Sequence, residues 1–110
     1  MSLKKALTYL TLLTDEQITK QQFYCLLGTA NLEQLNGLCE LFYNITSGHI
    51  ELDASSTRLV RRHDKILRAL TNRKQYSYRK RVQILRKNVR VVGRIVKKII
   101  PFIKKVLKKL

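Results

Sequence analysis

Apolar residues recur at helical spacing along most of this 110-residue chain, and that pattern predicts an all-α fold. Each of the first four predicted helices is preceded by a Ser, Thr, Asn or Asp, whose side chain can accept hydrogen bonds from the first backbone amides. Thr14 with Gln17, and Asn31 with Gln34, have the spacing of a capping box, and Gly28 is expected to end the second helix in a left-handed conformation. The predicted helices cover residues 3–13, 15–27, 32–45, 54–70 and 77–110, and the fourth of them is capped by Asp53 or by Ser55.

Residues 89–110 show the sharpest division between apolar and charged positions. Drawn as a helix, they place Val and Ile side chains on one half and only Lys and Arg on the other. This arrangement is typical of a helix that lies in a membrane interface, although the outer helix of a soluble bundle can show it too. Lysine pairs recur too often for a helix that spans a bilayer. Membrane insertion is predicted for Val92, Ile95, Ile99, Phe102, Ile103, Val106 and Leu110, and headgroup binding for Lys97, Lys98, Lys104, Lys105, Lys108 and Lys109.

One apolar stripe runs along residues 78–110 at alternating steps of four and three residues. Such a stripe also permits self-association through a coiled-coil seam. Pro101 lacks an amide hydrogen and clashes with the preceding turn, so a kink is expected there. The predicted architecture is a small helical bundle, residues 1–71, followed by a long basic amphipathic C-terminal helix within residues 72–110, kinked near Pro101.

The chain carries 23 Lys and Arg residues against 7 Asp and Glu residues, a formal net charge of +16 at pH 7. This charge is divided unevenly along the sequence. Residues 1–57 hold three cations and six acids, a net charge of −3, whereas residues 58–110 hold twenty cations and one acid, Asp64, a net charge of +19. So basic a half indicates a polyanionic partner, either an anionic membrane surface or a nucleic acid.

Arginine and lysine are also segregated within the basic half. Arginine predominates from Arg58 to Arg94, and every later cation is lysine. The planar guanidinium group suits phosphate oxygens, and Tyr76 and Tyr78 lie among these cations, where rings can stack on bases. Double-stranded DNA or another nucleic acid is therefore a candidate partner, bound through its phosphates without a base-reading motif. The predicted contact residues are Arg58, Arg61, Arg62, Arg68, Arg73, Lys74, Tyr76, Tyr78, Arg79, Lys80, Arg81 and Arg86.

The sequence lacks recognisable motifs of catalysis. It has no nucleophile elbow, phosphate-binding loop or paired-carboxylate pattern, so we expect a non-enzymatic protein with no cofactor and no metal site. Cys25 and Cys39 are expected to be buried thiols, and His63 a half-buried, hydrogen-bonded side chain. The N-terminal apolar run is short and meets Asp15 and Glu16 without a cleavage site, which argues against a signal peptide.

The middle of the chain, LCELFYNI…SGHIEL…LVRRHDKILRAL, joins a helix containing Leu and Glu, a short link with a glycine, and a basic helix. The residues that carry this pattern are Leu38, Glu40, Asn44, Ile45, Gly48, Ile50, Leu52, Leu59, Arg62, Leu67, Arg68 and Leu70. The pattern resembles the small basic open reading frames of Polinton (Maverick) elements and related adintoviruses. The resemblance implies an accessory or core protein of a virus-like particle.

These observations support three hypotheses of function. The leading one is a virion-type accessory protein whose cationic C-terminal helix binds and perturbs anionic membranes, located in the virion or inside the host cell, in the nucleus, the cytoplasm or peripherally on membranes. The alternative is a DNA-binding and condensing core protein that uses the Arg-rich segment 58–94. A structural oligomer joined through the apolar stripe is the third. The first requires the apolar face of residues 89–110 to lie on the surface, whereas the second has it packed against the rest of the chain.

Overall fold

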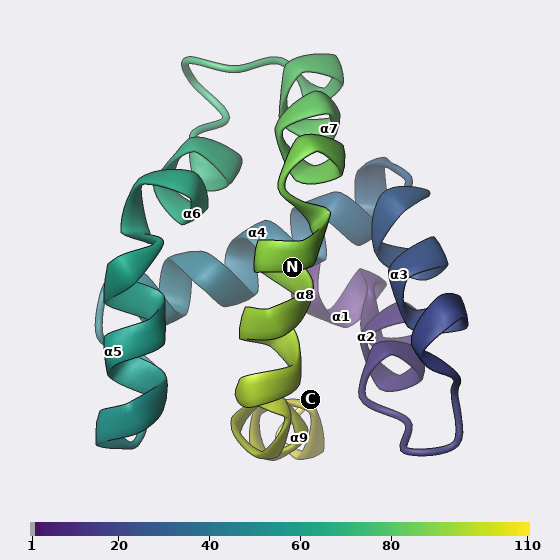
Figure 1. Ribbon diagram of the computed structural model, residues 1–110, viewed down its shortest axis with the longest axis vertical. Helices are drawn as coiled ribbons and strands as arrows, with labels where there is room; N and C mark the ends of the chain where they lie inside the picture. The colour runs from purple at the N-terminus through teal and green to yellow at the C-terminus, as the bar shows by residue number, and fades with distance from the viewer. Residues whose placement is uncertain (1) are drawn as a thin grey trace.

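The computed structural model describes residues 2–110, and these residues form nine α-helices and no strand. The all-α prediction is therefore confirmed. Figure 1 shows α4 crossing behind α8, with α5 and α6 on the opposite side of the molecule from α2 and α3. The Cα atoms extend over 30 × 27 × 26 Å. The helices are α1 (Ser2–Lys5), α2 (Leu7–Leu13), α3 (Lys20–Gly28), α4 (Leu32–Thr46), α5 (Ala54–Arg62), α6 (Asp64–Thr71), α7 (Tyr78–Lys87), α8 (Val89–Lys98) and α9 (Ile100–Lys108).

Side-chain caps begin three of these helices where the sequence predicts them. Asn31 and Gln34 form a capping box at the start of α4, each side chain accepting a hydrogen bond from the other's backbone amide at 2.9 Å. Asp53 Oδ1 accepts from the Ser56 amide at 2.8 Å at the start of α5, and Ser77 caps α7 in the same way. These caps satisfy backbone amides that have no partner within a helix.

Helix α3 begins later than the sequence indicates. Its capping box is formed by Thr19 and Gln22, so the predicted box of Thr14 with Gln17 is wrong. Thr14 instead ends α2, where its buried hydroxyl donates to a carbonyl of the same helix at 3.1 Å. A threonine hydroxyl can serve a free amide at a helix start or a free carbonyl at a helix end, and its sequence position does not decide between them. Gly28 is the last residue of α3 and lacks the predicted left-handed conformation.

The long C-terminal helix of the prediction is divided into α7, α8 and α9, so a single kinked helix is wrong. The first break is at Asn88, whose side-chain amide donates to the Ile84 carbonyl at 2.9 Å. The Asn88 backbone amide donates to the same carbonyl at 3.1 Å, so the side chain and the backbone of Asn88 share one acceptor at the break. The second break is at Ile99, just before Pro101. Pro101 fits the first turn of α9, because an amide hydrogen at that position would have no helical partner.

Helices from both halves of the sequence build one hydrophobic core. Helix α8 packs against α3 and α5, α7 packs against α3 and α6, and α9 packs against α2. On α8, Val92, Ile95 and Val96 are fully buried. Residues 72–110 therefore complete the core of residues 2–71, and the structure does not separate them as a tail.

Candidate polyanion-binding surface

Most apolar side chains predicted to insert into a membrane are inside the fold. Their face of α8 and α9 packs against apolar side chains of α2, α3 and α5, so the expectation that this face lies on the surface is wrong. No helix among residues 2–110 is both long enough and apolar enough to cross a bilayer. Val92, Ile95, Ile99 and Ile103 are buried, Phe102 and Val106 are half-buried, and Leu110 is exposed.

The lysines predicted to bind lipid headgroups point away from the core. Lys104 is partly covered, and its Nζ lies 3.6 Å from the Glu16 carboxylate. The Lys97 Nζ lies 4.9 Å from the centre of the Phe23 ring and 5.4 Å from that of the Tyr24 ring, a cation–π geometry that joins α8 to α3. Part of the charge of α8 and α9 is therefore engaged within the molecule. The exposed members are Lys97, Lys98, Lys105, Lys108 and Lys109.

The cations predicted to contact nucleic acid are exposed, with one exception. They lie on α5, α6 and α7 and on the link between α6 and α7. Arg86 Nε donates to the Gly28 carbonyl at 3.0 Å, placing a positive charge at the negative end of α3. Arg73 Nη2 donates to the Asn36 carbonyl at 3.4 Å. The exposed members of the set are Arg58, Arg61, Arg62, Arg68, Arg73, Lys74, Arg79, Lys80 and Arg86.

Arg81 is the exception, because it is only 3% exposed and belongs to the core. Its guanidinium group donates to Asn36 Oδ1 at 3.4 and 3.5 Å and to Cys39 Sγ at 3.4 Å. Its Nε is buried and finds no hydrogen-bond partner among the described residues. The prediction that Arg81 contacts nucleic acid is wrong for this fold, since the helical position that it occupies faces α4 rather than solvent.

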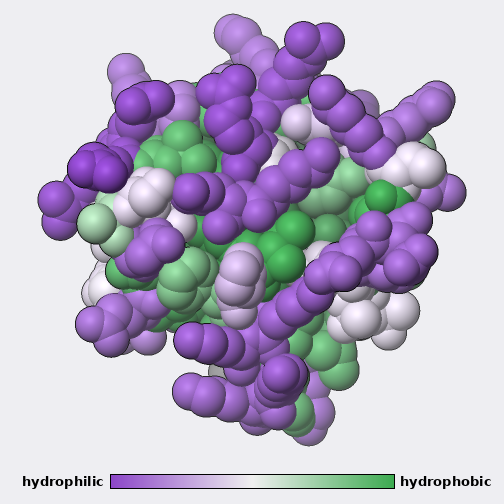
Figure 2. Space-filling model, turned by 60° about the horizontal axis from the view of Figure 1, so that its bottom comes forward, coloured by the Kyte–Doolittle hydropathy of each residue, from purple (hydrophilic) through white to green (hydrophobic). Residues whose placement is uncertain are grey.

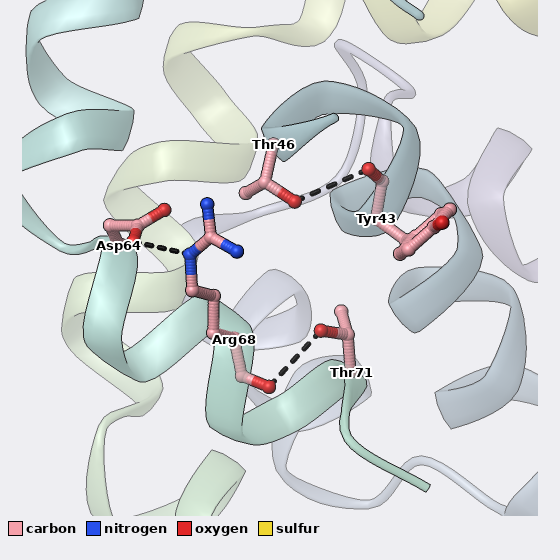
Figure 3. Close-up of polar contacts among 5 residues, drawn as sticks. All are labelled: Tyr43, Thr46, Asp64, Arg68 and Thr71. Atoms are coloured by element: carbon pink, nitrogen blue, oxygen red, sulfur yellow. Dashed lines mark hydrogen bonds and ion pairs between the residues drawn. The ribbon is translucent and has the colours of Figure 1, made fainter. Parts of the chain in front are cut away.

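Arg68 is an exposed cation whose charge is partly neutralised by a neighbouring acid. In Figure 3 its Nε is joined to the Asp64 carboxylate one turn earlier on α6, at 2.5 Å, while the two terminal nitrogens point toward Thr46 at the end of α4. The cavity beside this pair, about 560 Å³, is lined by Glu51 as well as by Arg61. Both signs of charge therefore meet there, so the cavity is a poor site for an anion.

The aromatic rings predicted to stack on bases are less available than the cations. Tyr76 is half-buried, and the Tyr78 hydroxyl donates to the Ala30 carbonyl at 3.2 Å, which fixes a ring that is 38% exposed. Sequence reasoning missed Tyr43, the most exposed large aromatic of the described residues at 55%. Its position off the apolar face of the helix at 32–45 is the feature that could have revealed it.

The described surface carries a large excess of positive charge. Figure 2 shows hydrophilic side chains spread over the whole visible face, with hydrophobic patches between them. The sequence has 23 Lys and Arg side chains and 7 Asp and Glu side chains, so carboxylates of the chain can balance only a minority of the positive charge. Several acids also have structural partners. Asp53 caps α5, and Glu40 accepts a hydrogen bond from the Leu3 amide at 2.6 Å.

The remaining chemically reactive groups are dispersed. Cys25 is exposed, so its predicted burial is wrong, whereas Cys39 is buried and its Sγ donates to the Leu70 carbonyl at 2.9 Å. Burial raises the pKa of the Cys39 thiol, and the nearby Arg81 charge opposes that rise. His63 Nε2 is buried without the expected hydrogen-bond partner among the described residues. No three His, Cys, Asp or Glu side chains of residues 2–110 come together where they could hold a metal ion.

Comparison with known protein families, curated proteins and solved structures finds no match to this chain. A functional conclusion must therefore come from the geometry and charge of the molecule itself.

Proposed function

We propose that this protein binds the phosphate backbone of double-stranded DNA without sequence preference, as a non-enzymatic core protein that condenses DNA. The burial of the apolar stripe carries the proposal. With that stripe inside the core, residues 58–110 present cations to solvent, and their charge is balanced by Asp64 alone within that segment. A folded body with such a surface is suited to neutralising phosphates. This role agrees with the virus-like particle implied by the resemblance of residues 38–70.

The energy of burial favours this proposal over membrane insertion. Burying a Val or Ile side chain contributes about 1.5–3 kcal/mol, so withdrawing Val92, Ile95, Ile99 and Ile103 from the core would cost on the order of 6–12 kcal/mol. The total stability of a small domain is about 5–15 kcal/mol. A bilayer would bury these four side chains again, but it would leave exposed the apolar side chains of α2, α3 and α5 that pack against them. Inserting the whole apolar face therefore requires the core to open. The same burial removes the apolar seam that a coiled-coil oligomer would need.

The test is equilibrium binding of the full chain to short double-stranded DNA, followed by fluorescence anisotropy at several salt concentrations. If six to ten cations contact phosphates, affinity should fall by about a thousandfold to a hundred-thousandfold between roughly 50 and 200 mM salt. Fragments of scrambled sequence should bind equally well. Salt-independent binding, or no binding at the lowest salt concentration, would refute the proposal.

A matched pair of variants separates the basic surface from net charge alone. Arg79→Gln/Lys80→Gln removes two exposed cations from α7, and Lys4→Gln/Lys5→Gln removes two exposed cations from α1. The α7 variant should weaken DNA binding about tenfold or more and reduce the salt dependence by about two phosphate contacts. The α1 variant should change affinity much less, because α1 belongs to the acidic half. Equal losses of DNA affinity in the α7 and α1 variants would contradict a binding surface localised in the basic half.

Peripheral membrane binding through the end of α9 is the second candidate. Val106 and Leu107 are only half-buried and Leu110 is 41% exposed, beside the exposed Lys105 and Lys109. These few residues could contact anionic headgroups without opening the core. Sedimentation with vesicles of anionic lipid should then show binding that Leu110→Ser weakens, with no leakage of vesicle contents. Leakage would indicate the deeper insertion that the first hypothesis requires.

A further inference from the structure

One cavity outside the predicted contact residues has cations of two helices around it. It lies between α3 and α8, measures about 460 Å³, and is lined by Lys20, Tyr24, Val89, Arg90 and Arg94. No acid is among these lining residues. The cavity near Arg68 differs in this respect, since Glu51 and Asp64 also line it.

The close approach of α3 to α8 that forms this cavity depends on Gly93. A Cβ atom at this position would lie 2.5 Å from Tyr24 Cε1 and 3.2 Å from Phe23 Cε2. Any larger residue would therefore have to displace the Tyr24 ring, which is one wall of the cavity. The Phe23 and Tyr24 rings meet edge to face with centroids 5.4 Å apart, and Lys97 lies over both. This packing holds Tyr24 beside Arg90 and Arg94.

We infer that the α3–α8 cavity binds the phosphate group of a nucleotide. Two guanidinium groups supply planar pairs of donors that suit phosphate oxygens, and Lys20 adds a mobile positive charge. Tyr24 lines the same cavity, and a phenol can donate or accept a hydrogen bond. The volume falls within the range of small-ligand sites and exceeds what a phosphate alone requires, leaving room for a sugar. The choice of a nucleotide as ligand rests on the proposed DNA-binding function, whereas the phosphate site itself does not.

The inference can be tested by titrating the full chain with adenosine monophosphate while recording amide NMR spectra. Amides of residues 20, 24, 90 and 94 should shift together along one saturable curve. Adenosine without phosphate should produce no such shifts, and glycerol phosphate should bind several-fold more weakly. Glycerol phosphate binding as tightly as adenosine monophosphate would overturn the nucleotide assignment in favour of lipid headgroups. Shifts scattered over all the cationic residues without saturation would overturn the site altogether.

Two variants and a control separate a built site from general positive charge. Arg90→Gln/Arg94→Gln should weaken nucleotide binding about tenfold or more. Lys105→Gln/Lys109→Gln removes the same charge from α9 and its C-cap, and it should leave the affinity within about twofold. Gly93→Ala keeps every charge but displaces the Tyr24 ring, and it should also weaken nucleotide binding several-fold. Equal losses in the α8 and α9 variants would contradict the inference, as would an unchanged affinity in Gly93→Ala.

Comparing DNA binding and nucleotide binding by the full chain distinguishes the two proposals. If the chain binds DNA with the expected salt dependence but gives no saturable nucleotide shifts, the cavity assignment is wrong and the DNA-binding proposal stands. If the nucleotide binds in the cavity while DNA does not bind at low salt, the DNA-binding proposal is wrong and the phosphate site stands.

Discussion

Helices α4 and α8 bury apolar faces in the same core yet present different surfaces to solvent. On α4, Leu35, Leu38 and Leu41 are buried, and the only charged side chains are two acids, Glu33 and Glu40. On α8, Val92, Ile95 and Val96 are buried, and the charged side chains are four cations and no acid. The inner faces are equivalent, and the outer faces are not.

The comparison of α4 with α8 separates two properties of an amphipathic helix, the burial of its apolar face and the charge of its outer face. The apolar face of a helix shows that it must be covered, and both helices satisfy that need within the molecule. The sign and density of charge on the outer face determine which partner the surface attracts. For α8 the apolar face therefore explains folding, and the proposed DNA binding rests on the cations.

The largest expected effect comes from placing a charge in the inner face of α8. Ile95→Asp should destabilise the protein by about 4 kcal/mol or more, because it buries an unpaired carboxylate and leaves a cavity. Leu32→Asp on the outer face of α4, where Leu32 is 49% exposed, should change stability by less than about 0.5 kcal/mol. Thermal unfolding followed by circular dichroism measures both. A cooperative unfolding transition in Ile95→Asp as stable as in the parent chain would contradict the burial of α8.

A smaller effect is expected where α8 meets α3. Gly93→Ala gains about 1 kcal/mol of helix propensity, but crowding the Tyr24 ring costs about 1–3 kcal/mol. We expect a net loss of about 1 kcal/mol in the free energy of unfolding. In a Tyr24→Ala background the same change should become neutral or stabilising. A double-mutant cycle in urea that shows no coupling between the two positions would indicate that α3 and α8 are not in close contact.

Two arginines of α7 extend the comparison between inner and outer faces. Arg81→Met removes a buried guanidinium that has only neutral partners and retains much of the side-chain volume, so stability should stay equal or rise by up to about 1 kcal/mol. DNA affinity should be unchanged. Arg79→Met removes an exposed cation, so it should weaken DNA binding about threefold or more with little effect on stability. Urea unfolding measures the stability of both variants, and fluorescence anisotropy on the same samples measures their DNA affinity. Weaker DNA binding in Arg81→Met together with unchanged binding in Arg79→Met would place Arg81 on the surface.

The smallest effect concerns pH at the start of α5, which packs against α8. Hydrogen bonding by Ser56, with a further contribution from the nearby Lys98 charge, holds the pKa of Asp53 below its ordinary value. Because the folded pKa lies below the unfolded pKa, the stabilisation is full above the unfolded pKa and disappears as pH falls through the folded value. Asp53→Ala should lower the unfolding midpoint slightly at neutral pH, and the difference should vanish in acid. A difference that persists in strong acid would exclude ionised Asp53 as its source.

The sequence predicts the helical class and several helix boundaries correctly because those features are local. Asn31 with Gln34 and the caps at Asp53 and Ser77 depend only on residues three positions apart. Three other boundaries are different: the division of the predicted helix 54–70 at His63, the break at Asn88, and the start of α3 after its cap, Thr19. At each of these positions a continuous helix and an interrupted or shifted one have similar local energies, and tertiary packing determines which of them forms.

The candidate site is predicted only in part, for a related physical reason. Composition indicates a polyanion-binding surface, and exposure of residues such as Arg79 follows from their helical positions. Helical position places Arg81 on the apolar half of the 78–110 pattern, but the sequence does not show that this half meets α4. Nor does it show that Lys20 on α3 lies across a cavity from Arg90 and Arg94 on α8. Those relations join residues far apart in the chain. An amphipathic helix whose charged face carries only cations can pack against a protein core or lie on a bilayer. Which of the two occurs depends on the helices that surround it in the fold.

Hydrogen exchange tests the central claim most directly, namely that the apolar stripe of residues 89–108 belongs to the core of the folded protein. Mass spectrometry of peptides from α8 and α4 should show similar protection, both exchanging only on global unfolding. Protection of α8 should persist when DNA is added, because its inner face is not the binding surface. Exchange of residues 89–108 on the timescale of a frayed terminus, while α4 stays protected, would contradict the account and restore a detachable C-terminal segment.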